Sequence, residues 1–280
     1  MGDSAWIERR KGTAVRPQRI VCLSAESADW LARIGAWDRV VGVTAFYRPA
    51  IGLAPKPRVG GFASANVDAV LSLGPDLVIL FSDVQAGVAA RLIAAGCTVF
   101  ATNPRTLSEI EHTLAWLGWL VGEHHASEAW LRSFREQMSA RAPLPRRIRV
   151  YFEEWDNPPI AGIRWISEMI ERAGGRDVFA DLAQHRQASA RTVTWQAIKE
   201  ADPEVILASW CGKPTIVEQI LSRPGWDQIT AVRRGAVYAV DPEFFLQPGY
   251  RLVEGLELLR RILESAAIES CGSRELGPAM

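Results

Sequence analysis

Residues 66–80 read NVDAVLSLGPDLVIL, and residues 194–207 read TWQAIKEADPEVIL. Each stretch predicts a short helix that runs into a proline turn and then into a buried strand. Any α/β protein can contain one such turn, but these two stretches match at one constant offset along the helix, the proline and the strand. A shared offset over so many positions indicates two equivalent lobes.

The segments around both stretches alternate between strands and helices. In the first half, the expected strands are residues 19–24, 40–44, 76–81 and 98–101. In the second half, the expected strands are residues 147–152, 204–208 and 236–240, and the last helix is residues 250–266. Strands that alternate with helices indicate βαβ units and a parallel sheet in each half.

A helical segment, residues 106–140, separates the two halves. Its apolar residues recur at helical spacing, and Gly122 is a place where the segment can break once. Three tryptophans also lie at helical spacing here, and we expect Trp116, Trp119 and Trp130 to be core residues.

The predicted fold is α/β, with two lobes that each contain a parallel sheet and flanking helices and that are bridged by a long helix. The chain has 280 residues, which is enough for two modest domains. The expected parts are a flexible arm at residues 1–17, an N-terminal α/β lobe at residues 18–105, a helical linker with the backbone helix at residues 106–142, and a C-terminal α/β lobe at residues 143–280.

The charges of the chain balance, since Lys plus Arg and Asp plus Glu both total 32. This balance gives no electrostatic reason to expect nucleic acid or an anionic membrane as a partner. Hydrophobic residues make up 48% of the chain, which supports sizeable cores. The four cysteines are far apart and form no CxxC pair, so we expect free thiols that pack as small apolar residues.

The first 19 residues contain no apolar core and no small-residue cleavage site, so they do not resemble a secretory signal. No stretch has the length and apolar character of a membrane span. As it stands, the sequence therefore predicts a cytoplasmic protein, and a periplasmic or cell-surface protein if a leader has been removed.

Motifs of common enzymes are missing from the sequence. It contains no Gly-rich phosphate loop, no GxSxG elbow and no HExxH helix. His124 and His125 follow Glu123 without further ligand partners at metal spacing, so we expect no metal site and no intrinsic cofactor. Glu153 and Glu154 end a predicted strand, where one of them at most contacts a ligand, because adjacent residues point to opposite sides of an extended chain. We expect no catalytic residue, since no nucleophile–base pair is recognisable.

Aromatic residues follow the ends of several predicted strands. Phe46, Tyr47 and Phe81 do so in the first half, and Trp155 and Trp210 do so in the second. The carboxyl ends of parallel strands open onto the ligand crevice of an α/β sheet. For any single ring a core position is as plausible as a pocket position, but the set favours a pocket.

Several motifs occur in a recognisable order and spacing. They are RIVCLS at 19–24, GV at 42–43, RVG at 58–60, NVD at 66–68, GPDLV at 74–78, ISEMI at 166–170, AGGRDVFAD at 173–181, DPEVIL at 202–207 and QPGYRL at 247–252. Together they resemble the periplasmic binding proteins for vitamin B12, ferric siderophores and haem, over about residues 18 to 265. The resemblance is closest to the cobalamin-binding branch.

This resemblance implies two lobes joined by one long helix, a ligand in the cleft between the lobes, and delivery of that ligand to an ABC importer. It implies that aromatic residues grip the corrin at Phe46, Phe62, Phe81 and Phe244 or Phe245. The complete set of expected ligand contacts adds Tyr47, Glu154, Trp155, Trp165 and Trp210. Docking to a permease is implied at Asp68, which is acidic, and at Gln196, where the family has a second acidic residue.

The main prediction is therefore a protein that binds a corrinoid, such as cobalamin, as the substrate-binding component of an ABC importer or as a relative that is not exported. Three alternatives remain. Arg48, Arg164 and Arg251 are compatible with a ferric siderophore or haem, because guanidinium groups bind carboxylates and phosphates alike. The same cleft is compatible with a cytosolic corrinoid salvage or sensing module, and the Glu153 and Glu154 region with an enzyme.

Overall fold

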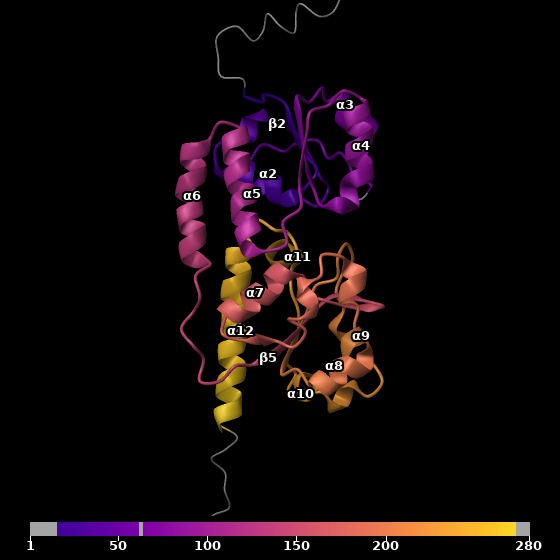
Figure 1. Cartoon of the computed structure of the whole chain (residues 1–280), viewed down its shortest axis with the longest axis vertical. Coiled ribbons are helices and arrows are strands. Elements are labelled where there is room, and N and C mark those ends of the chain that lie inside the picture. Colours follow the sequence, from indigo (N-terminus) through magenta and orange to yellow (C-terminus); the bar gives the residue numbers. More distant parts are fainter. Residues whose placement is uncertain (1–15, 62–63, 273–280) are drawn as a thin grey trace, which may run out of the picture. The chain divides into compact units, whose positions relative to one another are not determined.

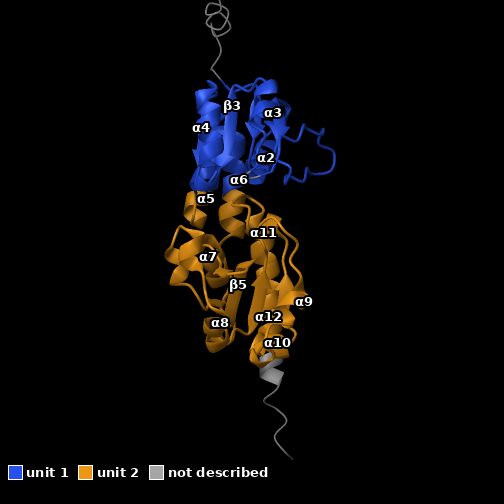
Figure 2. Cartoon of the chain, turned by 90° about the vertical axis from the view of Figure 1, so that its right-hand side faces the viewer, with its two compact units in different colours: residues 1–103, 111–131 blue, residues 104–110, 132–280 orange. Residues whose placement is uncertain are grey.

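The computed structural model describes residues 16–61 and 64–272, so most of the expected N-terminal arm lies outside the described residues. The chain divides into two compact units (Figure 2). Unit 1 comprises residues 1–103 and 111–131, and unit 2 comprises residues 104–110 and 132–280.

Unit 1 is built on a four-stranded parallel sheet in the order β2-β1-β3-β4. Its strands are β1 (Ile20–Cys22), β2 (Val40–Val43), β3 (Leu77–Phe81) and β4 (Val99–Thr102). Its helices include α2 (Ala25–Arg33), α3 (Val67–Ser72) and α4 (Ala86–Ala94), with short 3-10 turns η1 (Trp37–Arg39) and η2 (Asp83–Gln85). Figure 1 shows α3 and α4 on one side of this sheet and α2 on the other, as a sheet buried on both faces requires.

Unit 2 is built on a five-stranded sheet in the order β6-β5-β8-β9, with β7 also paired to β5. Its strands are β5 (Arg149–Asp156), β6 (Pro159–Ala161), β7 (Arg176–Asp177), β8 (Val205–Ala208) and β9 (Val237–Ala239). Its helices include α7 (Arg164–Arg172), α8 (Trp195–Ala201), α9 (Val217–Leu221), α10 (Thr230–Arg233), α11 (Pro242–Phe245) and α12 (Leu252–Gly272), with the 3-10 turns η3 (Leu182–Gln184), η4 (Ala188–Arg191) and η5 (Trp226–Gln228). Strand β6 runs antiparallel to β5, and this hairpin was not expected from the sequence.

The two repeated stretches form the same local structure in both units. Asn66 caps α3 by accepting a hydrogen bond from the backbone N–H of Ala69 (3.1 Å), and Thr194 caps α8 by accepting one from Ala197 (3.1 Å). Each helix then leads into a strand that lies between two parallel neighbours, β3 in unit 1 and β8 in unit 2. The predicted fold class, two α/β lobes with parallel sheets and flanking helices, is confirmed.

The helical segment between the halves contains two helices, α5 (Leu107–Leu120) and α6 (His124–Gln137). They lie side by side (Figure 1), with the hydroxyl of Ser127 on α6 donating to the carbonyl of Leu114 on α5. The break falls where the sequence allowed it, at Gly122, whose φ of 72° belongs to the left-handed region. The segment therefore holds two helices of 14 residues each, where the family resemblance implied one long helix.

The prediction that Trp116 and Trp119 are core residues is wrong. Trp116 is 58% exposed and Trp119 is 69% exposed. The buried stripe of this segment consists instead of Ile110, Leu114, Leu117 and Val121. Trp119 stacks on His124 with ring centroids 4.5 Å apart, so the two tryptophans lie on the side of α5 away from the core. Trp130 is partly buried, and its indole N–H donates to the carbonyl of Arg33 (2.9 Å).

Candidate functional site

The order in which strands are added to the sheet of unit 1 reverses between β1 and β3. The chain moves from β1 to β2 on one side, and β3 then pairs with β1 on the other side. Gln85 joins the carboxyl ends of these two strands. Its side chain accepts a hydrogen bond from the backbone N–H of Phe81 (2.8 Å) and donates one to the carbonyl of Leu23 (3.0 Å). Ser82 follows β3 with φ at 74°, an uncommon value for a residue with a side chain. The carboxyl edge between β1 and β3 is therefore held in a fixed and locally strained form.

The predicted ligand rings of unit 1 differ in exposure. Phe46 is 47% exposed, and Phe81 is 9% exposed. Tyr47 is 3% exposed and packs against Trp37 with ring centroids 5.4 Å apart. Phe62 lies outside the described residues. Among the predicted ligand rings of unit 1 that the structure describes, Phe46 is the most exposed. The placement of Tyr47 in the core does not support its predicted ligand contact.

Glu26 lies in the first turn of α2, directly after β1, and is only partly exposed. Burial raises the pKa of its carboxyl to about 7. Hydrogen bonds from its own backbone N–H and from Ser24 lower the pKa, but their effect is smaller than that of burial. The ordinary value is 4.5, so the folded state binds more protons than the unfolded state between these two pH values.

We therefore expect the stability of the protein to fall as pH rises from about 4.5 to about 7 through this group. Glu26→Gln should remove that dependence. The difference in free energy of unfolding between the variant and the original protein should favour the variant by about 2 kcal/mol more at pH 8 than at pH 4, after allowance for the partial exposure of Glu26. Urea unfolding of both proteins across this pH range measures the difference. A parallel pair of stability–pH curves would contradict the assignment.

In unit 2, Glu153 lies on the inward side of β5 and is fully buried. Its carboxylate accepts hydrogen bonds from both terminal nitrogens of Arg223 (2.6 and 2.8 Å), from the indole N–H of Trp210 (3.0 Å) and from the hydroxyl of Tyr151 (3.2 Å). Four donors occupy the lone pairs of this carboxylate, so it holds the core together and is not available as a general base.

Glu154 follows Glu153 on β5, at the point where the pairing of β5 with β6 shifts in register. It receives both terminal nitrogens of Arg191, at 2.5 and 3.2 Å, and Arg191 also donates to the carbonyl of Ala161. The side chain of Glu154 is 19% exposed while that of Arg191 is 2% exposed. The ion pair links η4 to the β5–β6 hairpin. The predicted contact between Glu154 and a ligand stays a prediction.

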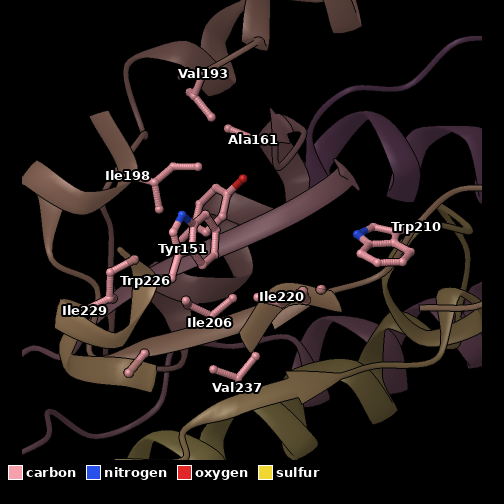
Figure 3. Close-up of a cluster of buried hydrophobic side chains, with 12 residues drawn as sticks. Tyr151, Ala161, Val193, Ile198, Ile206, Trp210, Ile220, Trp226, Ile229 and Val237 are labelled. Carbon is pink, nitrogen blue, oxygen red and sulfur yellow. The ribbon is translucent and has the colours of Figure 1, made fainter. Parts of the chain in front are cut away.

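Three of the predicted ligand rings in unit 2 are core residues. Trp165 and Trp210 are each 2% exposed, and Phe245 is fully buried. The indole N–H of Trp165 donates to the carbonyl of Phe245 (2.8 Å). Trp210 belongs to a cluster of buried apolar residues in this unit and lies at one end of it in Figure 3, away from Tyr151 and Trp226. Their burial does not support the prediction that these rings contact a ligand.

Two predicted rings of unit 2 remain partly exposed, and each is covered by a cation. The ammonium of Lys213 lies 4.3 Å from the ring centroid of Trp155, and the guanidinium of Arg251 lies 4.6 Å from that of Phe244. Arg251 also forms an ion pair with Glu243. Sequence reasoning missed Lys213, Arg191 and Arg223, because their partners are remote in the chain or carry no spacing signal.

The two predicted docking residues are both exposed, each in the first turn of its helix. Asp68 lies on α3, and Gln196 lies on α8, where its amide donates to the carboxylate of Glu200 (2.8 Å). Within residues 16–61 and 64–272, no group of three or more His, Cys, Asp or Glu side chains could hold a metal ion. In the same part of the chain, no helix is long and apolar enough to cross a membrane.

Comparison with known proteins identifies relatives over most of the chain. A sequence model described as "Periplasmic binding protein" matches residues 20–244. A "Cobalamin-binding protein" of Halobacterium salinarum is 28% identical over 263 residues, which cover 90% of this chain and 71% of that protein. The Fe(3+) dicitrate-binding periplasmic protein FecB of Escherichia coli is 28% identical over 246 residues, which cover 80% of this chain and 77% of FecB. The ABC transporter substrate-binding lipoprotein YvrC of Bacillus subtilis is 27% identical over 256 residues, covering 87% and 79%.

Solved structures share the fold. The heme-binding protein RhuT from Roseiflexus superposes with a TM-score of 0.76 at 22% identity and covers 89% of this chain and 99% of its own. The vitamin B12-binding protein BtuF of Vibrio cholerae superposes with a TM-score of 0.66, also at 22% identity, and covers 89% and 98%. At these identities the structural match concerns the fold alone.

Proposed function

This chain belongs to the periplasmic binding protein family, and from that premise we propose that it binds a corrinoid as a substrate-binding protein. The observation that carries the proposal is the match, over 90% of the chain, to a relative named as a cobalamin-binding protein. We propose that the ligand contacts the aromatic rings that keep exposed surface, which are Phe46, Trp155 and Phe244. Flat apolar rings suit a large macrocycle, since each stacked pair contributes about 1 kcal/mol beyond area burial.

We propose that the chain catalyses nothing. Both carboxylates that the sequence offered for an acid–base role have arginine partners, Glu153 with Arg223 and Glu154 with Arg191. A general base needs a free lone pair directed at a substrate proton, and these contacts leave Glu153 without one. The alternative of an enzyme built on these two residues is therefore disfavoured.

A ferric siderophore or haem is the second candidate ligand class. FecB supports it as a relative of equal identity over a somewhat shorter alignment. Arg251 supports it chemically, because its guanidinium beside Phe244 is 28% exposed and can pair with a carboxylate. Arg164, which is 44% exposed and forms an ion pair with Glu168 one helical turn away, offers the same chemistry.

Docking to a permease stays a proposal at one position of each unit. Asp68 offers an exposed carboxylate, while the amide of Gln196 is engaged with Glu200. An interface that needs one acidic partner on each unit loses most of one charged contact when a neutral amide replaces the carboxylate. We therefore propose that association with a permease of the B12 type is weak.

Titration with a panel of ligands tests the proposed function. The panel contains cobalamin, cobinamide, haem and ferric dicitrate, and the readout is quenching of tryptophan fluorescence. We expect a corrinoid to quench with a dissociation constant of about 1 µM or below, which corresponds to about 8 kcal/mol. Quenching by ferric dicitrate or haem without any response to the corrinoids would assign the chain to the second ligand class.

A further inference from the structure

Lys213 occupies the aromatic surface of unit 2 at the carboxyl ends of its central strands. The residue lies in the loop between β8 and α9. Its ammonium is 4.3 Å from the ring centroid of Trp155, 4.9 Å from that of Trp210, and 2.7 Å from a carboxylate oxygen of Asp156. A single flexible side chain therefore covers one face of the Trp155 ring, which the proposed function assigns to a ligand.

The loop around Lys213 is tied down at its start. The backbone N–H of Trp210 donates to the hydroxyl of Thr215 (2.9 Å), and that of Cys211 donates to the carbonyl of Glu154 (3.3 Å). The side chain of Lys213 is less constrained, since it is 38% exposed. Cation–aromatic contacts and ion pairs are both weak at exposed sites, so an incoming ring can displace the ammonium while the loop stays in place.

The acidic residues of this region differ in whether they can form an ion pair with the ammonium of Lys213. Glu153 is bound by Arg223, and Glu154 is bound by Arg191. Among the described residues, Asp156 is the acid that pairs with Lys213, and its carboxylate is 17% exposed. The ammonium is carried on a four-carbon side chain, so it stays close to Trp155 when a ligand ring displaces it. There it can form a charge-assisted hydrogen bond with an anionic group of that ligand.

We propose that Lys213 is a specificity-determining residue: it covers Trp155 in the unliganded protein, and it pairs with a phosphate or carboxylate at the rim of a ring stacked on Trp155. This inference rests on the proposed function for the position of the ligand. It goes beyond it by assigning an anionic group to the preferred ligand. Cobalamin carries such a group in the phosphate of its nucleotide, and cobinamide lacks that nucleotide.

The test compares the protein with its Lys213→Met variant, which keeps an apolar stem and removes the charge. The unmodified protein should bind cobalamin about tenfold more tightly than dicyanocobinamide, as a charge-assisted hydrogen bond provides. The variant should lose this preference, and its affinity for cobinamide should stay equal or rise because Trp155 is uncovered. Lys56→Met is the matched control, since Lys56 lies over Trp37 in unit 1 at 5.4 Å; it should leave the preference unchanged.

A second ligand pair separates failure of this inference from failure of the proposed function. Haem and its dimethyl ester differ in anionic groups, so loss of discrimination between them in Lys213→Met supports the inference even if neither corrinoid binds. Labelling of the exposed thiol of Cys211, followed by peptide mass spectrometry, tests whether the loop stays in place. The labelling rate should not rise in the variant, because hydrogen bonds from the backbone N–H groups of Trp210 and Cys211 still hold the loop. Ligand ratios that do not change in the variant, or a labelling rate that rises several-fold, would overturn the proposal.

Discussion

Replacing Arg223 by methionine is expected to lower the free energy of unfolding by about 3–5 kcal/mol. Methionine keeps much of the side-chain volume but leaves the carboxylate of Glu153, which is fully buried, without its cationic partner. The guanidinium also lies 4.4 Å from the ring centroid of Trp226, so a cation–aromatic contact is lost as well. Urea unfolding followed by circular dichroism measures the effect.

The double variant Glu153→Gln/Arg223→Met is the control for this prediction. It removes the unpaired charge and leaves a neutral amide, whose oxygen can accept the hydrogen bond from the indole N–H of Trp210 while its NH2 group donates to the hydroxyl oxygen of Tyr151. We expect it to recover at least half of the stability lost in Arg223→Met, since an unpaired buried charge costs more than a neutral polar group. A single variant as stable as the original protein would show that the pair contributes nothing to this core.

Trp210→Ala is expected to lower the free energy of unfolding by about 3–5 kcal/mol, because the deletion leaves a cavity in a buried apolar cluster of unit 2. It also removes the indole donor to Glu153. The sequence favoured a ligand-binding role for this tryptophan, whereas its 2% exposure assigns it to the core. Chemical unfolding of the purified variant gives the value.

Trp116→Ala is the matched comparison, because Trp116 is 58% exposed. We expect its stability to stay within about 0.5 kcal/mol of the original, as for other surface substitutions. Equal losses in the two variants would contradict the assignment of Trp210 to the core and of Trp116 to the surface.

The order of strands and helices was predictable because it depends on local patterns. The two repeated stretches predicted β3 and β8 correctly, because a capped helix, a turn and an apolar run are each encoded by adjacent residues. The error at Trp116 and Trp119 was avoidable. At about 100° per residue, these positions lie about 130° and 170° from the centre of the stripe formed by Ile110, Leu114, Leu117 and Val121.

The polar network of unit 2 was not predictable from the sequence. Arg223 reaches Glu153 across 70 positions of the chain, and Arg191 reaches Glu154 across 37. No periodicity connects such pairs, because they are set by how the strands and loops pack. The same holds for Trp210: its place after β8 was predicted, but the direction of its indole depends on a loop that turns it toward Glu153.

Equilibrium dialysis of the full chain against labelled cobalamin tests the central claim most directly, because it measures bound ligand and not a change in signal. We expect one cobalamin per chain, with a dissociation constant of about 1 µM or below. Trp155→Ala should raise that constant by about tenfold or more, because the ring removed is one that keeps exposed surface. If the protein retained no cobalamin even at ligand concentrations about a hundred times the expected dissociation constant, the account would be contradicted.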